Sequence, residues 1–292
     1  MKYIAPTLTA LKSSTEIDVE SCLRHYDFLI EGGIDGVAIF GSSGEFPHLP
    51  LEERKKLISA AVKHIDHRMQ VFIGTGEMQV EDCISLSEFA LEQGADGVMI
   101  VGPYYFALND ESVFRYYDRV ASAVKGKIYI YNYPERTGYS VSPEVVLKLA
   151  ELHPNIAGIK DTIPDMAHTV ALIQTVKSRL PHFEVLSGFD YNFAANVMAG
   201  GDGCIAALAN IRPKLCSAWR DAMKNGDYDA AAKYQIIFNR LVAIYGVTFP
   251  FMAGMKSVLV DMDIFTSDTV CFPYQESTAS QKQRVRDILK DF

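Results

Sequence analysis

Eight short apolar runs recur along the chain, and each is followed by a segment in which apolar residues return at helical spacing. The runs are residues 4–8, 36–40, 71–74, 97–101, 128–131, 156–159, 183–186 and 203–207. Their spacing of about 20–35 residues is that of consecutive βα units. Each run is almost continuously apolar, as strands covered on both faces are. The sequence therefore predicts eight parallel strands that alternate with helices.

Two glycine-rich connections mark the passage from a helix to the next strand. Residues 94–97 (Gly-Ala-Asp-Gly) and 200–203 (Gly-Gly-Asp-Gly) are near copies of each other. Glycine at such a place ends a helix, which supports a repeated helix-to-strand unit. The strand signals stop after residue 207. Helical periodicity continues in residues 212–225, 228–245, 250–260 and 277–289.

No Pro/Ser-rich linker divides the 292 residues, so we predict one domain. Residues 1–225 are expected to form a (β/α)8 TIM barrel of the α/β class, and residues 226–292 a C-terminal helical extension of the same domain. A barrel of this kind takes about 250 residues. Periodicity alone does not say whether the sheet closes, so a doubly wound open sheet stands beside the barrel at this stage.

The composition limits the partners and the compartment. The chain has 28 Lys+Arg against 36 Asp+Glu and a net charge of −8, whereas nucleic-acid binding needs clustered basic side chains. Its five cysteines have no CxxC spacing, so we expect reduced thiols rather than disulfides or a zinc ribbon. The sequence has neither a signal-peptide pattern nor a run of about 20 apolar residues. We expect a cytoplasmic protein with no nucleic-acid or membrane partner.

Lys160 is the most informative candidate for chemistry. In a closed barrel the reactive groups come from the C-terminal ends of the strands, and Lys160 directly follows the apolar run 156–159. Burial disfavours an ammonium and lowers its pKa from a reference of about 10.4. The neutral amine can then attack a carbonyl and form a Schiff base. A lysine at this position can equally point into water, so position alone leaves both interpretations open.

Tyr133 lies at the end of the neighbouring predicted strand, where Pro134 ends the strand. A phenol can carry protons to and from a carbinolamine or an aldol oxygen if nearby hydroxyls, such as those of Ser42 and Tyr105, relay them. Ser42 and Ser43 lie between glycines and could hold a carboxylate with hydroxyl and N–H groups. An ordinary strand aromatic and an ordinary glycine-serine turn are the structural alternatives.

Arg136 could clamp a second carboxylate with its two-pronged guanidinium, or could be a solvated loop arginine. The chain lacks the Gly-Lys-Ser/Thr of a P-loop, the Gly-x-Ser-x-Gly of a hydrolase elbow and a complete dinucleotide fingerprint. Its histidines are scattered and form no metal-ligand pattern. We therefore expect neither a cofactor nor a metal.

The chain resembles the dihydrodipicolinate synthase/N-acetylneuraminate lyase family of class I aldolases in three motifs. They are residues 41–45 (Gly-Ser-Ser-Gly-Glu), 131–134 (Tyr-Asn-Tyr-Pro) and 158–161 (Gly-Ile-Lys-Asp), in this order. The resemblance extends from residues 5–7 to 203–205 and covers the whole predicted barrel. It implies a closed (β/α)8 barrel with C-terminal helices and a pyruvate-dependent lyase.

The resemblance also implies a role for each matching residue. Lys160 would form the imine with C2 of pyruvate, and Tyr133 would shuttle protons. Ser42 and Ser43 would hold the carboxylate of pyruvate, at a position where many members have Thr-Thr or Ser-Thr.

The remaining site residues come from the same resemblance. The backbone of Gly188 and Ile205 would line the pocket. Tyr105 resembles the tyrosine that a neighbouring subunit contributes to the proton relay in the synthases, which implies a homo-oligomer, either a dimer or a tetramer. Arg136, in Pro-x-Arg-Thr-Gly, resembles the clamp for the carboxylate of aspartate semialdehyde.

The motifs point to more than one branch of the family. Residues 160–163 (Lys-Asp-Thr-Ile) resemble the 2-keto-3-deoxy-sugar-acid aldolases, whereas synthases usually follow the lysine with Glu-Ala. We predict a lyase that cleaves or forms a 2-keto-3-deoxy sugar acid, with pyruvate and an aldehyde as its other reactants. The alternatives are a 4-hydroxy-tetrahydrodipicolinate synthase that condenses pyruvate with aspartate semialdehyde, an N-acetylneuraminate lyase, and a non-catalytic regulator that binds a keto acid.

Overall fold

The computed structural model describes residues 1–292. Its eight parallel strands are hydrogen-bonded in the order β1-β10-β9-β8-β7-β6-β5-β4, a closed barrel. These strands are β1 (Lys2–Pro6), β4 (Gly36–Ile39), β5 (Gln70–Gly74), β6 (Gly97–Val101), β7 (Ile128–Asn132), β8 (Ile156–Asp161), β9 (Glu184–Ser187) and β10 (Gly203–Ile205). The predicted (β/α)8 barrel is confirmed, and the open doubly wound sheet is excluded.

Helices follow the strands and continue after the last one. The α-helices are α1 (Val19–Glu31), α2 (Leu51–Ile65), α3 (Val80–Glu92), α4 (Asp110–Ala123), α5 (Pro134–Thr137), α6 (Pro143–Leu152), α7 (Met166–Leu172), α8 (Phe193–Met198), α9 (Pro213–Lys224), α10 (Tyr228–Leu241), α11 (Phe251–Asp261) and α12 (Ala279–Leu289). The four helical segments expected after residue 207 correspond to α9 to α12. The boundary expected near residue 225 falls between α9 and α10 and stays a prediction.

Three strands, β7, β8 and β9, continue past the C-terminal end of their apolar runs. β7 ends at Asn132 and β8 at Asp161. Lys160 therefore lies within β8, whereas the sequence analysis placed it after the strand. The backbone ladder continues through these residues, with Lys160 opposite Tyr131 and Asp161 opposite Asn132. The reason is that ladder hydrogen bonds join main-chain groups and do not depend on side-chain polarity.

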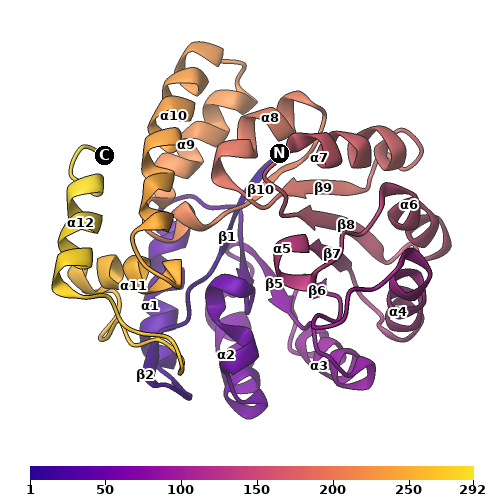
Figure 1. The fold of residues 1–292 in the computed structure, drawn as a ribbon, viewed down its shortest axis with the longest axis horizontal. Helices are drawn as coiled ribbons and strands as arrows, with labels where there is room; N and C mark the ends of the chain where they lie inside the picture. The colour runs from indigo at the N-terminus through magenta and orange to yellow at the C-terminus, as the bar shows by residue number, and fades with distance from the viewer. The chain divides into compact units, whose positions relative to one another are not determined.

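Contacts group the chain into two compact units. The first consists of Met1–Lys2 and Val71–Ile205, and it holds the strands β5 to β10. Helices α3, α4, α6, α7 and α8 follow one another along the outside of these strands, each packed against the next (Figure 1). Within this unit β8 pairs with β7 on one side and β9 on the other, and its residues are almost completely buried.

The second unit consists of Tyr3–Gln70 and Ala206–Phe292. Helices α9 and α10 lie side by side, as do α1 and α2 (Figure 1). Trp219 of α9 stacks on Phe238 of α10 with ring centroids 4.4 Å apart, and both side chains are fully buried. A short antiparallel hairpin, β2 (Leu11–Ser13) with β3 (Glu16–Ile17), was not predicted, because strands this short carry no readable periodicity.

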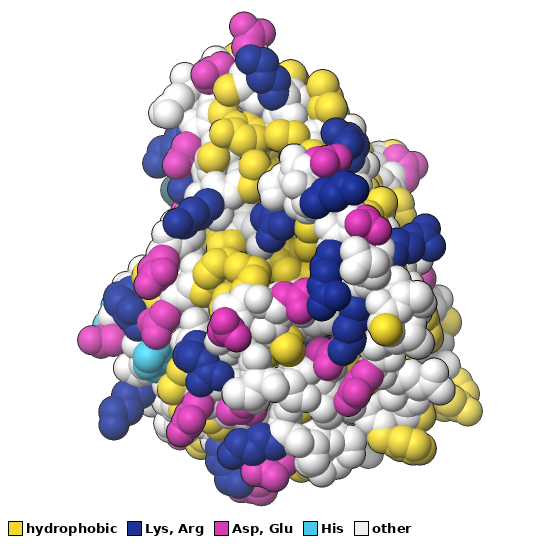
Figure 2. Space-filling model, turned by 90° about the vertical axis from the view of Figure 1, so that its left-hand side faces the viewer, with side chains coloured by type: hydrophobic (Ala, Val, Ile, Leu, Met, Phe, Trp, Pro, Cys, Tyr) yellow, Lys and Arg dark blue, Asp and Glu magenta, His cyan; other side chains and the backbone are white.

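The surface carries side chains of both charges, and the cysteines lie in the interior. Figure 2 shows one face on which Lys and Arg side chains are interspersed with Asp and Glu side chains, while hydrophobic side chains gather between them. All five cysteines are buried and none forms a disulfide. No single helix has the length and apolar character to span a membrane, although the bent pair Tyr228–Gly246 and Phe251–Asp261 passes that test together by length and composition.

Candidate active site

Lys160 is buried near the C-terminal end of β8, with only 4% of its surface exposed. Its Nζ lies 4.2 Å from the centre of the Tyr131 ring, which belongs to the neighbouring strand β7. Lys160 forms no ion pair. Burial lowers the pKa of its ammonium to about 7, against the opposing influence of Cys204 and Asp190. Near neutral pH a large fraction of the side chain is therefore a neutral, nucleophilic amine.

This pKa predicts the pH dependence of imine formation. We expect the rate at which borohydride traps pyruvate on Lys160 to rise with pH through about 7 and to level off above it. Well below the pKa the amine fraction, and with it the rate, should fall about tenfold per pH unit. A series of trapping rates from pH 5 to 10, read by mass spectrometry, measures this. A rate that keeps rising to pH 10 would mean that Lys160 titrates as an ordinary lysine.

Tyr133 follows β7 at the point where that strand ends. Pro134 occupies the first position of the four-residue helix α5, which stops the strand, and Gly138 with a φ of 80° ends that helix. The Tyr131 and Tyr133 rings are stacked with their centroids 5.9 Å apart. The exposed Arg136 holds its guanidinium carbon 5.7 Å from the centre of the Tyr133 ring.

The surroundings of Tyr133 keep it protonated. Burial raises the pKa of its phenol, Tyr131 adds to this, and the positive charge of Arg136 opposes it. A phenol that remains protonated at neutral pH can donate a proton and accept one in return, as a relay does. The structure thus places Lys160 over the Tyr131 ring, Tyr131 against Tyr133, and Arg136 over the Tyr133 ring.

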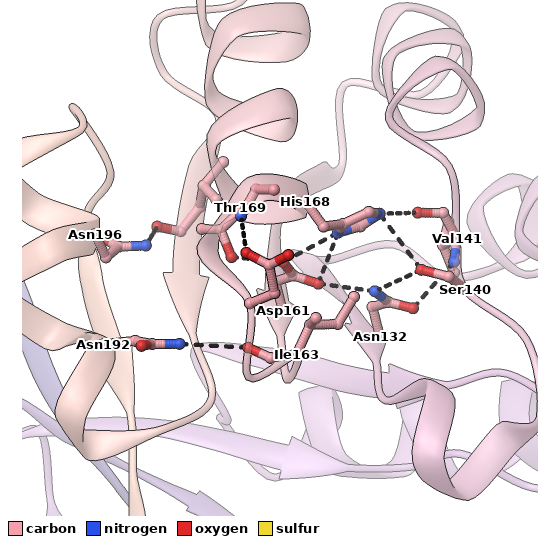
Figure 3. A network of polar contacts seen from close by, with 12 residues as sticks. Asn132, Ser140, Val141, Asp161, Ile163, His168, Thr169, Asn192 and Asn196 are labelled. Carbon is pink, nitrogen blue, oxygen red and sulfur yellow. Dashed lines mark hydrogen bonds and ion pairs between the residues drawn. The ribbon is translucent and has the colours of Figure 1, made fainter.

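Gly188 and Thr162 shape the adjoining strand ends. The Gly188 N–H donates to the carbonyl of Asp161 at 2.8 Å. A Cβ on Gly188 would lie 2.0 Å from Oγ1 of Thr162, so no larger residue fits there. That Thr162 hydroxyl, two residues after Lys160, is buried and has no hydrogen-bond partner. Asn192 fixes the following turn by donating to the carbonyl of Ile163 at 3.3 Å (Figure 3).

The other predicted residues of this unit differ in their surroundings. Ile205 ends β10 and is 2% exposed, next to Cys204, which is opposite Ser187 of β9. Tyr105, in contrast, is 86% exposed and has a φ of 92°. Its ring contacts that of Phe106 edge to face, with centroids 5.0 Å apart. The structure does not bring Tyr105 to Lys160 or Tyr133 within this chain.

Ser42 and Ser43 lie in the second unit, in a 3-10 turn (Ser42–Gly44) that directly follows β4. Ser43 is buried. Glu45 closes the turn with a φ of 57°, and its carboxylate accepts from the Cys271 N–H at 2.7 Å and pairs with the ammonium of Lys256. The turn is thus held in a defined shape at the C-terminal end of a barrel strand, which is where the sequence analysis expected it.

Two features of the site were not predicted. Tyr131 entered the sequence analysis only within the motif at residues 131–134. Its place opposite Lys160 in the ladder depends on a strand register that the sequence does not reveal. Thr162 entered it only within the motif at residues 160–163, because a buried hydroxyl without a partner can be recognised only in the structure. No group of three or more His, Cys, Asp or Glu side chains is placed to hold a metal ion.

A buried lysine with a lowered pKa, near the end of a barrel strand and over a tyrosine ring, is the arrangement that a lyase working through a Schiff base needs. A family model described as "Dihydrodipicolinate synthetase family" matches residues 1–292, and the chain belongs to this family. The protein is accordingly an aldolase or lyase of the Schiff-base type.

Several relatives are similar over almost their whole length. The chain is 35% identical to "Putative 2-dehydro-3-deoxy-D-gluconate aldolase YagE" of Escherichia coli K12, over 98% of this chain and 95% of the relative. It is 33% identical to "Probable 2-dehydro-3-deoxy-D-pentonate aldolase YjhH" of the same organism, with the same two coverages. It is 34% identical to a 4-hydroxy-tetrahydrodipicolinate synthase of Kosmotoga olearia, over 94% of this chain and 93% of the relative.

A solved structure supports the same relationship. The crystal structure of YagE from E. coli K12 in complex with pyruvate superposes with a TM-score of 0.96 at 34% identity. The match covers 99% of this chain and 97% of that one.

Proposed function

We propose that this protein cleaves a 2-keto-3-deoxy sugar acid to pyruvate and an aldehyde, through an imine on Lys160. The observation that carries the proposal is the buried Lys160 amine, with a pKa of about 7, against the Tyr131 ring. An amine poised in this way serves a reaction that begins with attack on a ketone.

In the proposed reaction Lys160 acts first and Tyr133 second. Lys160 adds to C2 of the keto acid, and loss of water gives a protonated imine. Tyr133 accepts the proton of the C4 hydroxyl while it passes its own phenol proton to a neighbouring hydroxyl of the relay. The C3–C4 bond breaks, and the electrons of that bond move to the imine nitrogen as the aldehyde leaves. The enamine is then protonated at C3, and water hydrolyses the imine to release pyruvate and restore the Lys160 amine.

Binding of the substrate is assigned to groups near the strand ends. Ser42 and Ser43 are our candidates for holding the carboxylate, and the backbone of Gly188 and Ile205 for lining the pocket. We propose that the substrate has polar atoms beyond C3, as a sugar acid does. The names of the relatives YagE and YjhH point in the same direction.

One observation favours a second candidate, a synthase that condenses pyruvate with aspartate semialdehyde. Arg136 lies beside Tyr133 and is exposed, so its guanidinium could bind the carboxylate of an incoming aldehyde. The similarity to the K. olearia synthase gives this candidate comparable support.

A direct comparison of substrates separates the two candidates. We expect pyruvate release from 2-keto-3-deoxygluconate or its pentonate homologue, and no consumption of pyruvate that depends on aspartate semialdehyde. Both reactions are followed by coupled assays on wild type and on Arg136→Ala. The synthase candidate requires that Arg136→Ala raise the KM for the semialdehyde, by roughly tenfold or more for loss of a charge-assisted pair. Turnover of the semialdehyde with no turnover of any sugar-derived keto acid would overturn our proposal.

We also propose that the protein acts as a homo-oligomer in which Tyr105 completes the proton relay of a second copy. Support comes from the adjacent exposed aromatic side chains of Tyr105 and Phe106, which are 86% and 74% exposed. Large exposed aromatic side chains are enriched in protein interfaces. Analytical ultracentrifugation should show a dimer or tetramer, and Tyr105→Ala with Phe106→Ala should shift it toward monomer. A wild-type monomer with full activity would remove this role of Tyr105.

A further inference from the structure

A buried polar network lies behind the two proposed catalytic residues, on the outer face of their strands. We call it the Asp161 network: Asn132, Ser140, Val141, Asp161, His168 and Thr169 (Figure 3). Successive side chains of a strand point to opposite faces. Asp161 therefore faces away from Lys160, its neighbour in β8, and Asn132 faces away from Tyr133, its neighbour at the end of β7.

The carboxylate of Asp161 is the centre of this network and is completely buried. It accepts from Asn132 Nδ2 at 2.7 Å and from Thr169 Oγ1 at 2.7 Å. Both of its oxygens lie 3.1 Å from Nδ1 of His168. Three separate donors therefore satisfy one buried charge, which is the condition under which such a charge is retained.

Asn132 connects Asp161 of β8 to the loop after α5 through hydrogen bonds. Its Nδ2 also donates to the Ser140 hydroxyl at 3.2 Å, and its Oδ1 accepts from the Val141 N–H at 3.0 Å. Asn132 and Asp161 are direct partners in the ladder between β7 and β8. One side-chain bond thus ties the two strand ends together at the residues adjacent to Tyr133 and Lys160.

His168, on α7, closes the network through both of its ring nitrogens. Its Nδ1 faces a carboxylate, which can only accept, so this nitrogen donates. Its Nε2 lies 3.2 Å from the Val141 carbonyl and 3.4 Å from the Ser140 hydroxyl. Burial lowers the pKa of His168, but the hydrogen bond and charge of Asp161 outweigh it with help from Val141, so the pKa lies above its ordinary value. The His168 ring therefore links Asp161 and α7 to the segment that leads into α6.

We propose that His168 is a positioning residue, which acts through Asp161 and Asn132 to hold the Lys160 amine and the Tyr133 hydroxyl in register for proton transfer. This inference rests on the proposed roles of Lys160 and Tyr133. Reacting groups must be held to within a fraction of an ångström, and a displacement of about 1 Å can cost roughly 100-fold in rate. The hydrogen bonds of the Asp161 network, on the outer face of the strands, supply that constraint without contacting the substrate.

The test uses pyruvate as the only ligand and reads two steps separately. Borohydride trapping reports imine formation at Lys160, and NMR-detected deuterium exchange into the pyruvate methyl group in D2O reports proton transfer from the imine. For His168→Gln, we expect the exchange rate at saturating pyruvate to fall by roughly 10- to 100-fold. The half-saturating pyruvate concentration and the extent of trapping should change by less than about threefold.

A matched control is available in the same unit. His153 forms a similar pair with Asp118, at 2.7 Å, and lies just before the opposite end of β8. His153→Gln should lose comparable thermal stability and leave both readouts unchanged. Thr169→Val, an isosteric change that removes one donor to Asp161, should show a smaller loss of exchange alone. If His168→Gln does not fold, Thr169→Val provides the test.

The outcomes separate the inference from the function on which it rests. If exchange in His168→Gln and Thr169→Val matches that of His153→Gln, or if trapping falls as much as exchange, the network only stabilises the fold and the inference fails. If wild type traps no pyruvate on Lys160, the proposed function itself fails, whatever the variants do.

Discussion

Lys160→Met is expected to remove activity almost completely while leaving a folded protein. Loss of a covalent nucleophile lowers turnover by roughly 10^4- to 10^6-fold, and methionine matches the length of lysine without an amine. Trapping with pyruvate and borohydride, followed by peptide mapping, should label the peptide that contains Lys160 in wild type and no peptide in the variant. Turnover retained in the variant would exclude every Schiff-base mechanism at this residue.

Lys148 offers a matched control for this experiment. Its ammonium also lies over an aromatic ring, 3.9 Å from the centre of Phe114, but the side chain is exposed on α6. Lys148→Met should therefore keep full activity and full labelling of Lys160. Equal losses in the two variants would show that the loss in Lys160→Met is not specific to a nucleophile at this position.

Lys160→Met should also stabilise the fold, by an amount that depends on pH. The pKa of Lys160 is about 7 in the folded protein, against about 10.4 in an unfolded chain. Between these values the unfolded chain binds a proton that the folded protein lacks, so wild-type stability rises with pH from about 7 to 10. The cost of the buried charge is fully present below pH 7. Lys160→Met should thus gain on the order of a few kcal/mol in unfolding free energy at neutral pH and below.

Thermal or urea unfolding of wild type and Lys160→Met across this range measures that gain. The difference between the two proteins should be largest near pH 6 and shrink toward pH 10, while other titrating groups cancel in the comparison. A difference that does not vary with pH would mean that the Lys160 amine is not desolvated in solution.

The fold was largely predictable because burial determines both strand composition and strand position. Parallel strands covered on both faces must be apolar, so the runs at residues 97–101 and 203–207 fall on β6 and β10. The closure of the barrel was not encoded in these runs, because it depends on which strands become neighbours. Resemblance to a family supplied it, and the observed strand order confirmed it.

The site was predictable only in part, for a related reason. Lys160 and Tyr133 could be found because polar residues at the ends of apolar strands are exceptional. The ring of Tyr131 under Lys160 depends on the register between β7 and β8, and the pairing of Asp161 with His168 depends on the turn that brings α7 back over β8. Neither contact has a fixed spacing in sequence, so only the three-dimensional structure reveals them.

Tyr133→Phe is expected to separate imine formation from proton transfer. The substitution keeps the ring that stacks on Tyr131 and removes only the hydroxyl. Loss of a general acid–base group costs typically about 10²- to 10⁴-fold, so turnover and deuterium exchange into pyruvate should fall by that much. The Lys160 amine is unchanged, so borohydride should still trap pyruvate on it.

Tyr131→Phe provides the control, because the proposed role of Tyr131 is carried by its ring beneath Lys160. Its exchange rate should stay within about threefold of wild type. If Tyr133→Phe abolishes trapping as well as exchange, the phenol is needed already for loss of water from the carbinolamine, and the relay acts before the imine exists. If instead both readouts survive in Tyr133→Phe, another group carries the proton. Tyr133 would then serve only to pack against Tyr131, and its raised pKa would reflect burial without a catalytic use.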